Sequence, residues 1–238
     1  MSTKARYENG LLRFFESTTQ ETVDVMAPVL FNEDFLGKAI DTTNIWTALD
    51  TSAAGNTTPV LVADAVSGLV SIPLDATNEV QLSGLTWGDQ RTLVLNQGVN
   101  VEFRFKLSVL PTGSVVACLG LCGDHNAAVN TVAEAIWFRA DGNGVLTVET
   151  DDTVNETSQV ATGVTLTTAD WCIARIDCTN PASVRFYING NQVASGTTFN
   201  MSQVAALALQ PVVRIGKEAG ATTVGTIQLD RVLCWQTR

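Results

Sequence analysis

Hydrophobic and polar side chains alternate along much of the chain with a period of two, which is typical of β-strands. The clearest case is the segment 100–109 (NVEFRFKLSV), where the odd-numbered residues are apolar and the even-numbered residues are polar or charged. Side chains of a strand point alternately to its two faces. This segment therefore predicts a strand with one face in a hydrophobic core and one face outside it.

Turn residues separate the predicted strands. Segments 135–139 and 145–150 are joined by ADGNG, whose Asp-Gly and Asn-Gly steps supply the positive φ angles of a tight hairpin. Strands are also predicted at 171–177 and 183–188, followed by the turn Asn189-Gly190-Asn191. Closely spaced strands and tight turns are typical of antiparallel sheets.

The chain closes on a predicted strand at 225–235, in which Asp230 and Arg231 interrupt the alternation. One or two helical turns are expected at 202–207 (SQVAAL), which opens with a helix-capping serine. Helical patterning is otherwise nearly absent. The pattern as a whole predicts an all-β protein, a two-sheet antiparallel jelly-roll sandwich with an extended N-terminal arm.

The arm is predicted at residues 1–28 and the sandwich at 29–238, because the first segment has clustered charges and lacks the turn rhythm that follows. The arm carries the apolar run Leu11, Leu12, Phe14 and Phe15, interrupted only by an arginine. Large apolar side chains need burial. We therefore expect these four residues to bind a partner or to pack on the sandwich.

Charge and hydropathy exclude several classes of protein. The net charge of the 238 residues is −10, and no stretch gathers the lysines and arginines that direct nucleic-acid binding needs. The longest apolar stretch, 204–213, is too short for a membrane helix. Residues 1–20 lack the apolar run of a secretory signal, so we expect folding in a cytoplasm and no membrane partner.

The cysteine pattern favours buried, reduced thiols, because five is an odd number and each cysteine lies in an apolar run. Cys118, Cys122 and His125 have a spacing that could hold zinc. No second ligand pair follows them, so the prediction is that no metal is bound.

Catalytic and cofactor motifs are not apparent in the sequence. His125 is the only histidine, no nucleophile elbow occurs, and no glycine-rich loop has the spacing of a phosphate cradle. The acidic run 149–152 (ETDD) has three interpretations: a solvated loop, a calcium site together with Glu156, or the paired acids of a sugar-cleaving enzyme. The solvated loop is favoured, and the chain is predicted to be no enzyme and to need no cofactor.

Aromatic side chains are candidates for sugar stacking, and the chain has five tryptophans. Core packing is the expected role for most of them. Trp87 lies among turn residues in GLTWGDQ, so it is the candidate glycan contact.

Two segments carry a resemblance to known proteins. The segment 169–197 (ADWCIARIDCTNPASVRFYINGNQVASGT) resembles the laminin-G and concanavalin A-like lectin/glucanase superfamily in its Trp-led strand and its FYxNG turn. The closing segment IQLDRVLCWQ is similar to the C-terminal strand of that superfamily. This resemblance implies a concanavalin A-like jelly roll and specifies a fold more than a function.

The segment 32–55 (NEDFLGKAIDTTNIWTALDTSAAG) resembles the opening of jelly-roll proteins in tailed-bacteriophage virions. That resemblance implies a non-enzymatic capsid decoration, or cement, protein that stabilises the lattice of the major capsid protein through its arm and sandwich edge. It also implies a homo-oligomer, a trimer or dimer, on the capsid surface of a virion assembled in the bacterial host cytoplasm. The alternative is a carbohydrate-binding module of a tail fibre or receptor-binding protein, with glycan as its partner.

Overall fold

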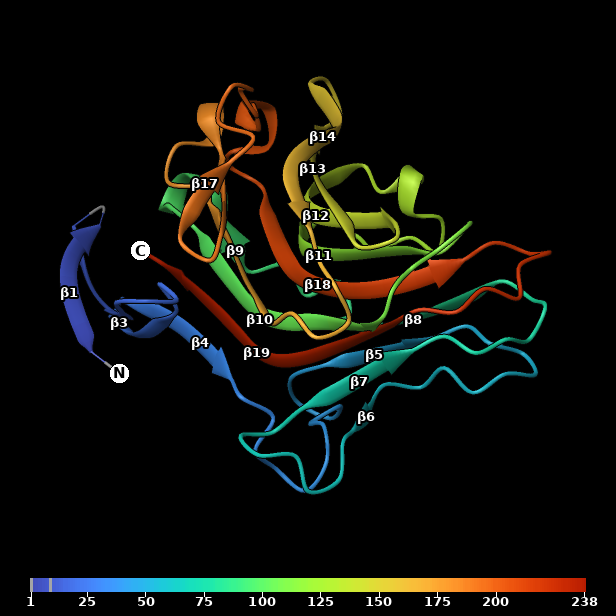
Figure 1. The fold of residues 1–238 in the computed structure, drawn as a ribbon. Helices are drawn as coiled ribbons and strands as arrows, with labels where there is room; N and C mark the ends of the chain where they lie inside the picture. Colours follow the sequence, from blue (N-terminus) through green and yellow to red (C-terminus); the bar gives the residue numbers. More distant parts are fainter. Residues whose placement is uncertain (1, 9) are drawn as a thin grey trace.

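The protein is described by a computed structural model that covers residues 2–8 and 10–238. Two eight-stranded antiparallel sheets stack as a jelly-roll sandwich, and a separate three-stranded sheet lies at one end beside the C-terminus (Figure 1). The predicted all-β fold is confirmed. In the described part of the chain, no helix is long and apolar enough to cross a membrane.

One sandwich sheet, the β10 sheet, is centred on the strand that the alternation predicted most clearly. Its order is β17 (Asn191–Val193), β16 (Arg185–Ile188), β15 (Cys172–Asp177), β10 (Asn100–Val109), β19 (Thr226–Gln236), β7 (Val70–Pro73) and β6 (Val60–Leu61), with β4 (Val29–Glu33) also paired to β19.

The second sandwich sheet, the β11 sheet, contains the predicted ADGNG hairpin between β12 and β13. Its order is β14 (Glu156–Thr165), β13 (Val145–Asp152), β12 (Glu134–Gly142), β11 (Val116–Cys122), β18 (Ala208–Lys217), β8 (Gln81–Thr86) and β5 (Thr47–Asp50), with β9 (Leu93–Val94) also paired to β18. Asn143 and Gly144 adopt positive φ angles of 49° and 79° at the turn. The predicted helical turn is a short 3-10 helix, Ser202–Val204.

The core lies between the two sheets and is made by the inward members of each alternating strand. Phe103 and Phe105 of β10 are fully buried. Phe138 of β12 meets Phe186 of β16 edge-on at 5.3 Å, and Phe186 meets Phe199 at 5.0 Å. Aromatic pairs in this geometry add roughly 0.5–1.5 kcal/mol each to the burial of their surface.

Three strands of the predicted arm, within residues 3–8 and 11–26, form a sheet of their own, which the sequence pattern did not indicate. This arm sheet consists of β1 (Thr3–Glu8), β2 (Leu11–Glu16) and β3 (Thr22–Met26), in that order. Val25 packs with Leu233 and Trp235 on the outward face of β19, and Leu11 lies against the same cluster. The arm sheet therefore docks on the outer face of the β10 sheet.

A buried ionic network completes this docking. The Glu102 carboxylate on β10 accepts hydrogen bonds from the Thr22 backbone N–H and hydroxyl, both at 2.8 Å. Arg13 of β2, whose side chain is 2 % exposed, donates Nε to the Thr22 hydroxyl at 2.7 Å and Nη2 to Glu102 at 3.4 Å. Charge-assisted hydrogen bonds of this kind are the strong ones, so Glu102 joins two arm strands to the sandwich.

We expect Glu102→Ala to lower the free energy of unfolding by about 1–3 kcal/mol, because it leaves the Thr22 backbone N–H and hydroxyl without their acceptor and leaves Arg13 with Glu8 as its carboxylate partner. Urea denaturation measures this change, and protease digestion tests whether the arm is released first. Ser108→Ala, on the same face of β10, is the matched control and should stay within about 0.5 kcal/mol of the wild type. Equal stability of the two variants would contradict this role for Glu102.

Candidate functional site

A cleft of about 1070 Å³ lies where the loop between β2 and β3 meets the outer face of the β10 sheet. This volume is at the upper end of the range found for small-molecule sites. Twelve of its sixteen lining residues are polar or charged, and one carries an aromatic ring. The charged and aromatic lining residues are Glu16, Glu21, Asp34, Arg104, Trp171, Asp230 and Arg231.

The ring in the cleft belongs to Trp171, which directly precedes β15 and is half-buried. The Arg104 guanidinium lies 4.5 Å from the ring centroid and the Lys106 ammonium lies 5.1 Å from it. These two cations are neighbours on the outer face of β10, beside the register pair Phe105 and Cys172. Cations over an indole face are attracted by its quadrupole, so the sheet holds the ring in place at the cleft wall.

A β-bulge in β19 places two charged residues in the cleft. Arg104 pairs with Arg231 but the next residue of β10, Phe105, pairs with Leu229, so Asp230 is the extra residue. A bulge of this kind re-aims side chains. Asp230 and Arg231 both line the cleft, although they are neighbours in sequence and would otherwise point to opposite faces.

Glu21 lies between the two cleft arginines. Its Oε2 is 3.8 Å from Nε of Arg104, and its Oε1 is 3.8 Å from Nη1 of Arg231. Arg104 also donates Nη1 to the carboxylate of Asp230. Burial raises the pKa of Glu21, and the two guanidinium groups oppose part of that rise. Glu21 and Asp230 therefore both lie against the guanidinium of Arg104, and Glu21 lies near Arg231 as well.

Glu16 shapes the loop that forms the opposite wall. Its Oε2 accepts hydrogen bonds from the backbone N–H groups of Thr19 at 2.6 Å and Thr18 at 2.7 Å. The bond from Thr19 is the largest cause that lowers the pKa of Glu16 to about 2. Glu16 is thus an ionised anchor that fixes the turn before Glu21.

The four predicted partner-binding residues lie on both faces of the arm sheet. Leu11 and Phe15 alternate with Leu12 and Phe14 along β2. Leu11 packs toward the sandwich, and the ring of Phe15, 7 % exposed, lies under the guanidinium of Arg6 at 4.7 Å. Leu12 and Phe14 are half-buried on the other face. None of the four lines the cleft.

The predicted glycan contact, Trp87, also lies outside the cleft. Its ring packs edge-on against Phe31 with centroids 5.1 Å apart, at the margin of the main core. A role for Trp87 in glycan binding stays a prediction.

The cysteine and histidine motif lies on the outer face of the β11 sheet and around it. Cys118 and Cys122 are buried there against Trp137 and Val132, and burial raises the pKa of both thiols to about 12. His125 faces away to Asp89, with Nδ1 2.9 Å from the carboxylate. Across residues 2–8 and 10–238, the structure has no group of three or more His, Cys, Asp or Glu side chains that could hold a metal ion.

The acidic run at 149–152 forms the C-terminal end of β13, and Glu149 and Asp152 are buried there, so the solvated loop favoured from the sequence is wrong. Glu149 is 8 % exposed and pairs with Arg139 at 3.3 Å. Asp152 accepts the backbone N–H of Asn155 at 2.6 Å and that of Gln203 at 3.2 Å. These contacts give Asp152 a role in holding the turn.

Sequence reasoning did not identify the cleft residues. The broken alternation at Asp230 and Arg231 was the one signal present, because an extra residue in a strand shifts the apolar period. Trp171 was noted only as the start of a strand. Glu21 and Arg104 had no local signal, since their significance depends on which strands lie side by side.

Comparison with known proteins shows the fold. No protein-family model matches the chain, and no curated protein matches it. The GH16 protein of the Bacteroides ovatus mixed-linkage glucan PUL, solved with its G4G4G3G product, matches with a TM-score of 0.60 and 10 % identity over 85 % of this chain and 98 % of that one.

Two further structures extend the comparison. A β-1,3-glucanase from Mycobacterium marinum matches with a TM-score of 0.58 and 15 % identity, over 87 % of this chain and 99 % of that one. The carbohydrate recognition domain of Emp47p matches with a TM-score of 0.53 and 8 % identity, over 82 % and 90 %. The concanavalin A-like jelly roll implied by the segment 169–197 is therefore confirmed. At these identities the likeness is one of fold.

Two expectations from the sequence are contradicted by these neighbours. The chain was expected to be a capsid decoration protein of a bacteriophage virion, and it was expected to be no enzyme. The solved structures that share its fold are mostly glucanases and related glycanases. A resemblance of fold does not specify a function, because one fold serves many functions.

The raised pKa of Glu21 predicts a pH-dependent effect of Glu21→Gln. A carboxyl whose pKa is higher in the folded than in the unfolded protein destabilises the fold once the pH rises above the unfolded value, about 4.3. Urea denaturation from about pH 3 to about pH 7 should therefore show the variant gaining stability relative to the wild type.

Glu16→Gln is the control, and its stability relative to the wild type should change with pH in the opposite direction. The folded pKa of Glu16 is about 2, so its ionisation stabilises the fold above the unfolded pKa, and that contribution disappears as the pH falls toward 2. The Glu16 variant should lose stability relative to the wild type as the pH rises. If both variants change in the same direction, the assignment for Glu21 is wrong.

Proposed function

We propose that the protein binds carbohydrate in the cleft between the arm sheet and the β10 sheet. The observation that carries this proposal is Trp171, a half-buried ring fixed at the cleft wall by Arg104 and Lys106. A rigid aromatic face surrounded by a few directed polar groups suits a sugar, which presents apolar C–H faces and a rim of hydroxyls.

The polar groups of the cleft fit a ligand rich in hydroxyl groups. The carboxylates of Glu21 and Asp230 are acceptors, and the guanidinium groups of Arg104 and Arg231 are donors with several N–H groups each. Asn32 and Asn189 add amide groups that donate and accept. Every hydroxyl of a pyranose both donates and accepts, so a mixed lining of this kind offers partners for each.

Charge in the cleft favours a neutral sugar over an acidic one. Its lining has four carboxylates, from Glu16, Glu21, Asp34 and Asp230, against the guanidinium groups of Arg104 and Arg231. The whole chain carries a net charge of −10. An excess of negative charge raises the free energy of a bound anion, so the proposed ligands are neutral glycans. The glycan-active neighbours of the same fold support the same class of ligand.

The test is binding to a glycan array followed by titration calorimetry with the glycan that binds best. Trp171→Ala should weaken binding by about tenfold or more, because loss of a buried aromatic anchor typically costs more than 1.4 kcal/mol. Trp171→Phe should retain most of the affinity, since it keeps a ring at the wall.

Tyr187→Ala is the matched control for this experiment. Tyr187 is the other half-buried ring on the outer face of the β10 sheet, and Arg175 lies 4.3 Å from its centroid, but it does not line the cleft. Its variant should bind like the wild type. No binding to any array glycan, or equal binding by Trp171→Ala, would overturn the proposal.

Hydrolysis of the bound glycan is the second candidate function. The observation that favours it is the pair Glu21 and Asp230, two carboxyls in one cleft that share Arg104 and lie in different surroundings. Glycosidases need one carboxyl that is protonated as an acid and one that is ionised. Burial raises the pKa of Glu21, which suits the role of the acid, and Asp230 accepts a hydrogen bond from Arg104 in the same cleft.

Release of reducing ends from laminarin and mixed-linkage glucan tests this second function. Glu21→Gln should lower the rate by about 100-fold or more, the usual contribution of a general acid, while leaving glycan binding on the array in place. Release at the wild-type rate by the variant would exclude Glu21 as the acid. Binding without release by the wild type would leave carbohydrate binding as the function of the cleft.

A further inference from the structure

The outer strand of the arm sheet has one unpaired edge. Residues Thr3–Glu8 of β1 pair along their whole length with β2, and within the described residues no strand pairs with the other edge of β1. An edge strand presents a row of free N–H and C=O groups to any strand that fits beside it. What fits is decided by the side chains on the two faces of β1.

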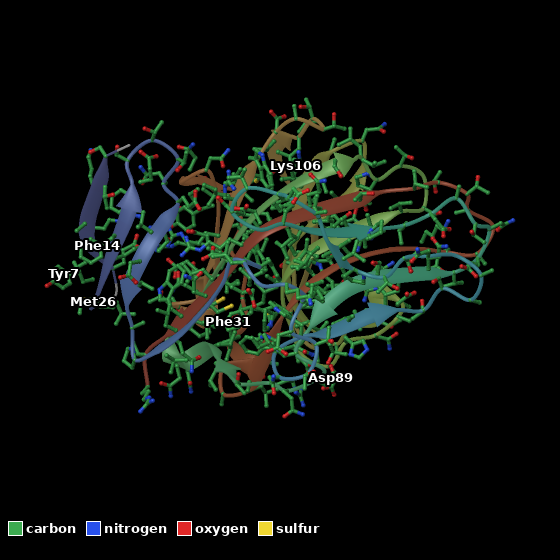
Figure 2. The ribbon with its side chains drawn as sticks, turned by 90° about the horizontal axis from the view of Figure 1, so that it is seen from below. Tyr7, Phe14, Met26, Phe31, Asp89 and Lys106 are labelled. Carbon is green, nitrogen blue, oxygen red and sulfur yellow. The ribbon has the colours of Figure 1, made fainter. Side chains whose placement is uncertain are left out.

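The outward face of the arm sheet carries an exposed apolar row. Tyr7 of β1 lies opposite Leu12 of β2, which lies opposite Met26 of β3, so the three form a row across the sheet. Tyr7 is 77 % exposed and Met26 is 65 % exposed. Tyr7, Phe14 and Met26 lie together at the end of the molecule away from the sandwich (Figure 2).

The other face of β1 carries its charges. Lys4, Arg6 and Glu8 lie opposite Phe15, Arg13 and Leu11 of β2, on the side that faces the sandwich. The strand therefore alternates strictly, with Ala5 and Tyr7 on the apolar side. The positive charge of Lys4 lies near the N-terminal end of β1, and the negative charge of Glu8 lies at its C-terminal end.

We infer that two copies of this protein associate through antiparallel pairing of their β1 strands about a twofold axis at Arg6. In this register Lys4 lies opposite Glu8 of the partner subunit, and Ala5 lies opposite Tyr7 of the partner subunit. The two arm sheets become one sheet of six strands, in which the apolar rows of both copies lie on the same face. Such a contact is isologous, so it closes as a dimer and does not propagate.

The side chains select this register over its neighbours. A shift by one residue sets the apolar face of one copy beside the charged face of the other. A twofold axis at Ala5 keeps the faces aligned but opposes Lys4 and Arg6, which are both positive. Only the axis at Arg6 aligns the faces and pairs opposite charges at both ends, and opposite charges across strands are worth about 0.2–1 kcal/mol per pair.

The arginine on the axis does not oppose this arrangement. Arg6 is already paired within its own chain, with Nη2 2.5 Å from Glu8 Oε1, and its guanidinium lies over the ring of Phe15. Within its own chain Glu8 also pairs with Arg13 at 3.1 Å and lies 3.6 Å from Arg175, and in the dimer it lies opposite Lys4 of the partner subunit. The positive charges near the axis thus lie close to the two Glu8 carboxylates.

Cysteine cross-linking tests the register directly. In the inferred dimer residue 6 faces itself across the axis, with Cα atoms at 4.5–5.5 Å as in any antiparallel pair, which is within reach of a disulfide. Arg6→Cys should form a disulfide-linked dimer under mild oxidation. Lys4→Cys is the matched control, because two copies of residue 4 lie about 13 Å apart along the strands and should not cross-link. The five native cysteines are buried and do not compete.

Sedimentation equilibrium tests the association itself on the full chain. The wild type should dimerise, and Lys4→Glu should raise the dissociation constant on the order of tenfold, because it sets two like-charge pairs in place of two opposite ones. Lys4→Arg should dimerise like the wild type. A wild type that stays monomeric, or a Lys4→Cys variant that cross-links as well as Arg6→Cys, would overturn the inference. Neither result bears on glycan binding, which is measured in the cleft.

Discussion

The carboxylate of Glu102, buried beneath the arm sheet, is the interaction on which the rest of the site depends. Thr22 and Arg13 from two different arm strands donate to it, so one side chain ties both strands to the sandwich. A buried charge is stable only when its partners are all in place. The arm sheet is thereby held in one orientation, and the loop that ends in Glu21 is held over the β10 sheet.

The cleft follows from this docking together with one irregularity of β19. A regular strand would turn either Asp230 or Arg231 into the core, where an ionised side chain is costly. The bulge sends both to the outer face, where Arg231 donates to the backbone carbonyl of Thr22 and lies beside Glu21. The same residue therefore helps to seat the arm and to line the cleft. Docking of the arm sheet and formation of the cleft are coupled because they share these side chains.

The concanavalin A-like jelly roll supplies a stable frame, and its functional surface depends on what is added to it. In this chain part of the outer face of the β11 sheet is covered, since Trp137 is 1 % exposed and packs with Cys118, Cys122 and Val132. The outer face of the β10 sheet carries Trp171 and receives the arm. The candidate cleft is thus formed by the docked arm and the sheet beneath it.

The sequence by itself determined the fold class, the predicted strand at β10, both hairpin turns and the concanavalin A-like likeness of the segment 169–197. These properties depend on residues that are close together in the sequence, because the alternation of polar and apolar side chains shows which face of a strand is buried. It also marked the irregularity at Asp230, without indicating its purpose.

Only the tertiary structure decided that the arm is a sheet, where it docks and which residues form the cleft. Thr22 and Glu102 are 80 positions apart, and Arg231 and Thr22 are 209 apart. Contacts over such separations depend on how strands are ordered in the sheets, and a local pattern of polar and apolar residues carries no information on that order. The physical reason is that burial is a local preference, whereas a charge network or a cleft is a property of surfaces that meet only after folding.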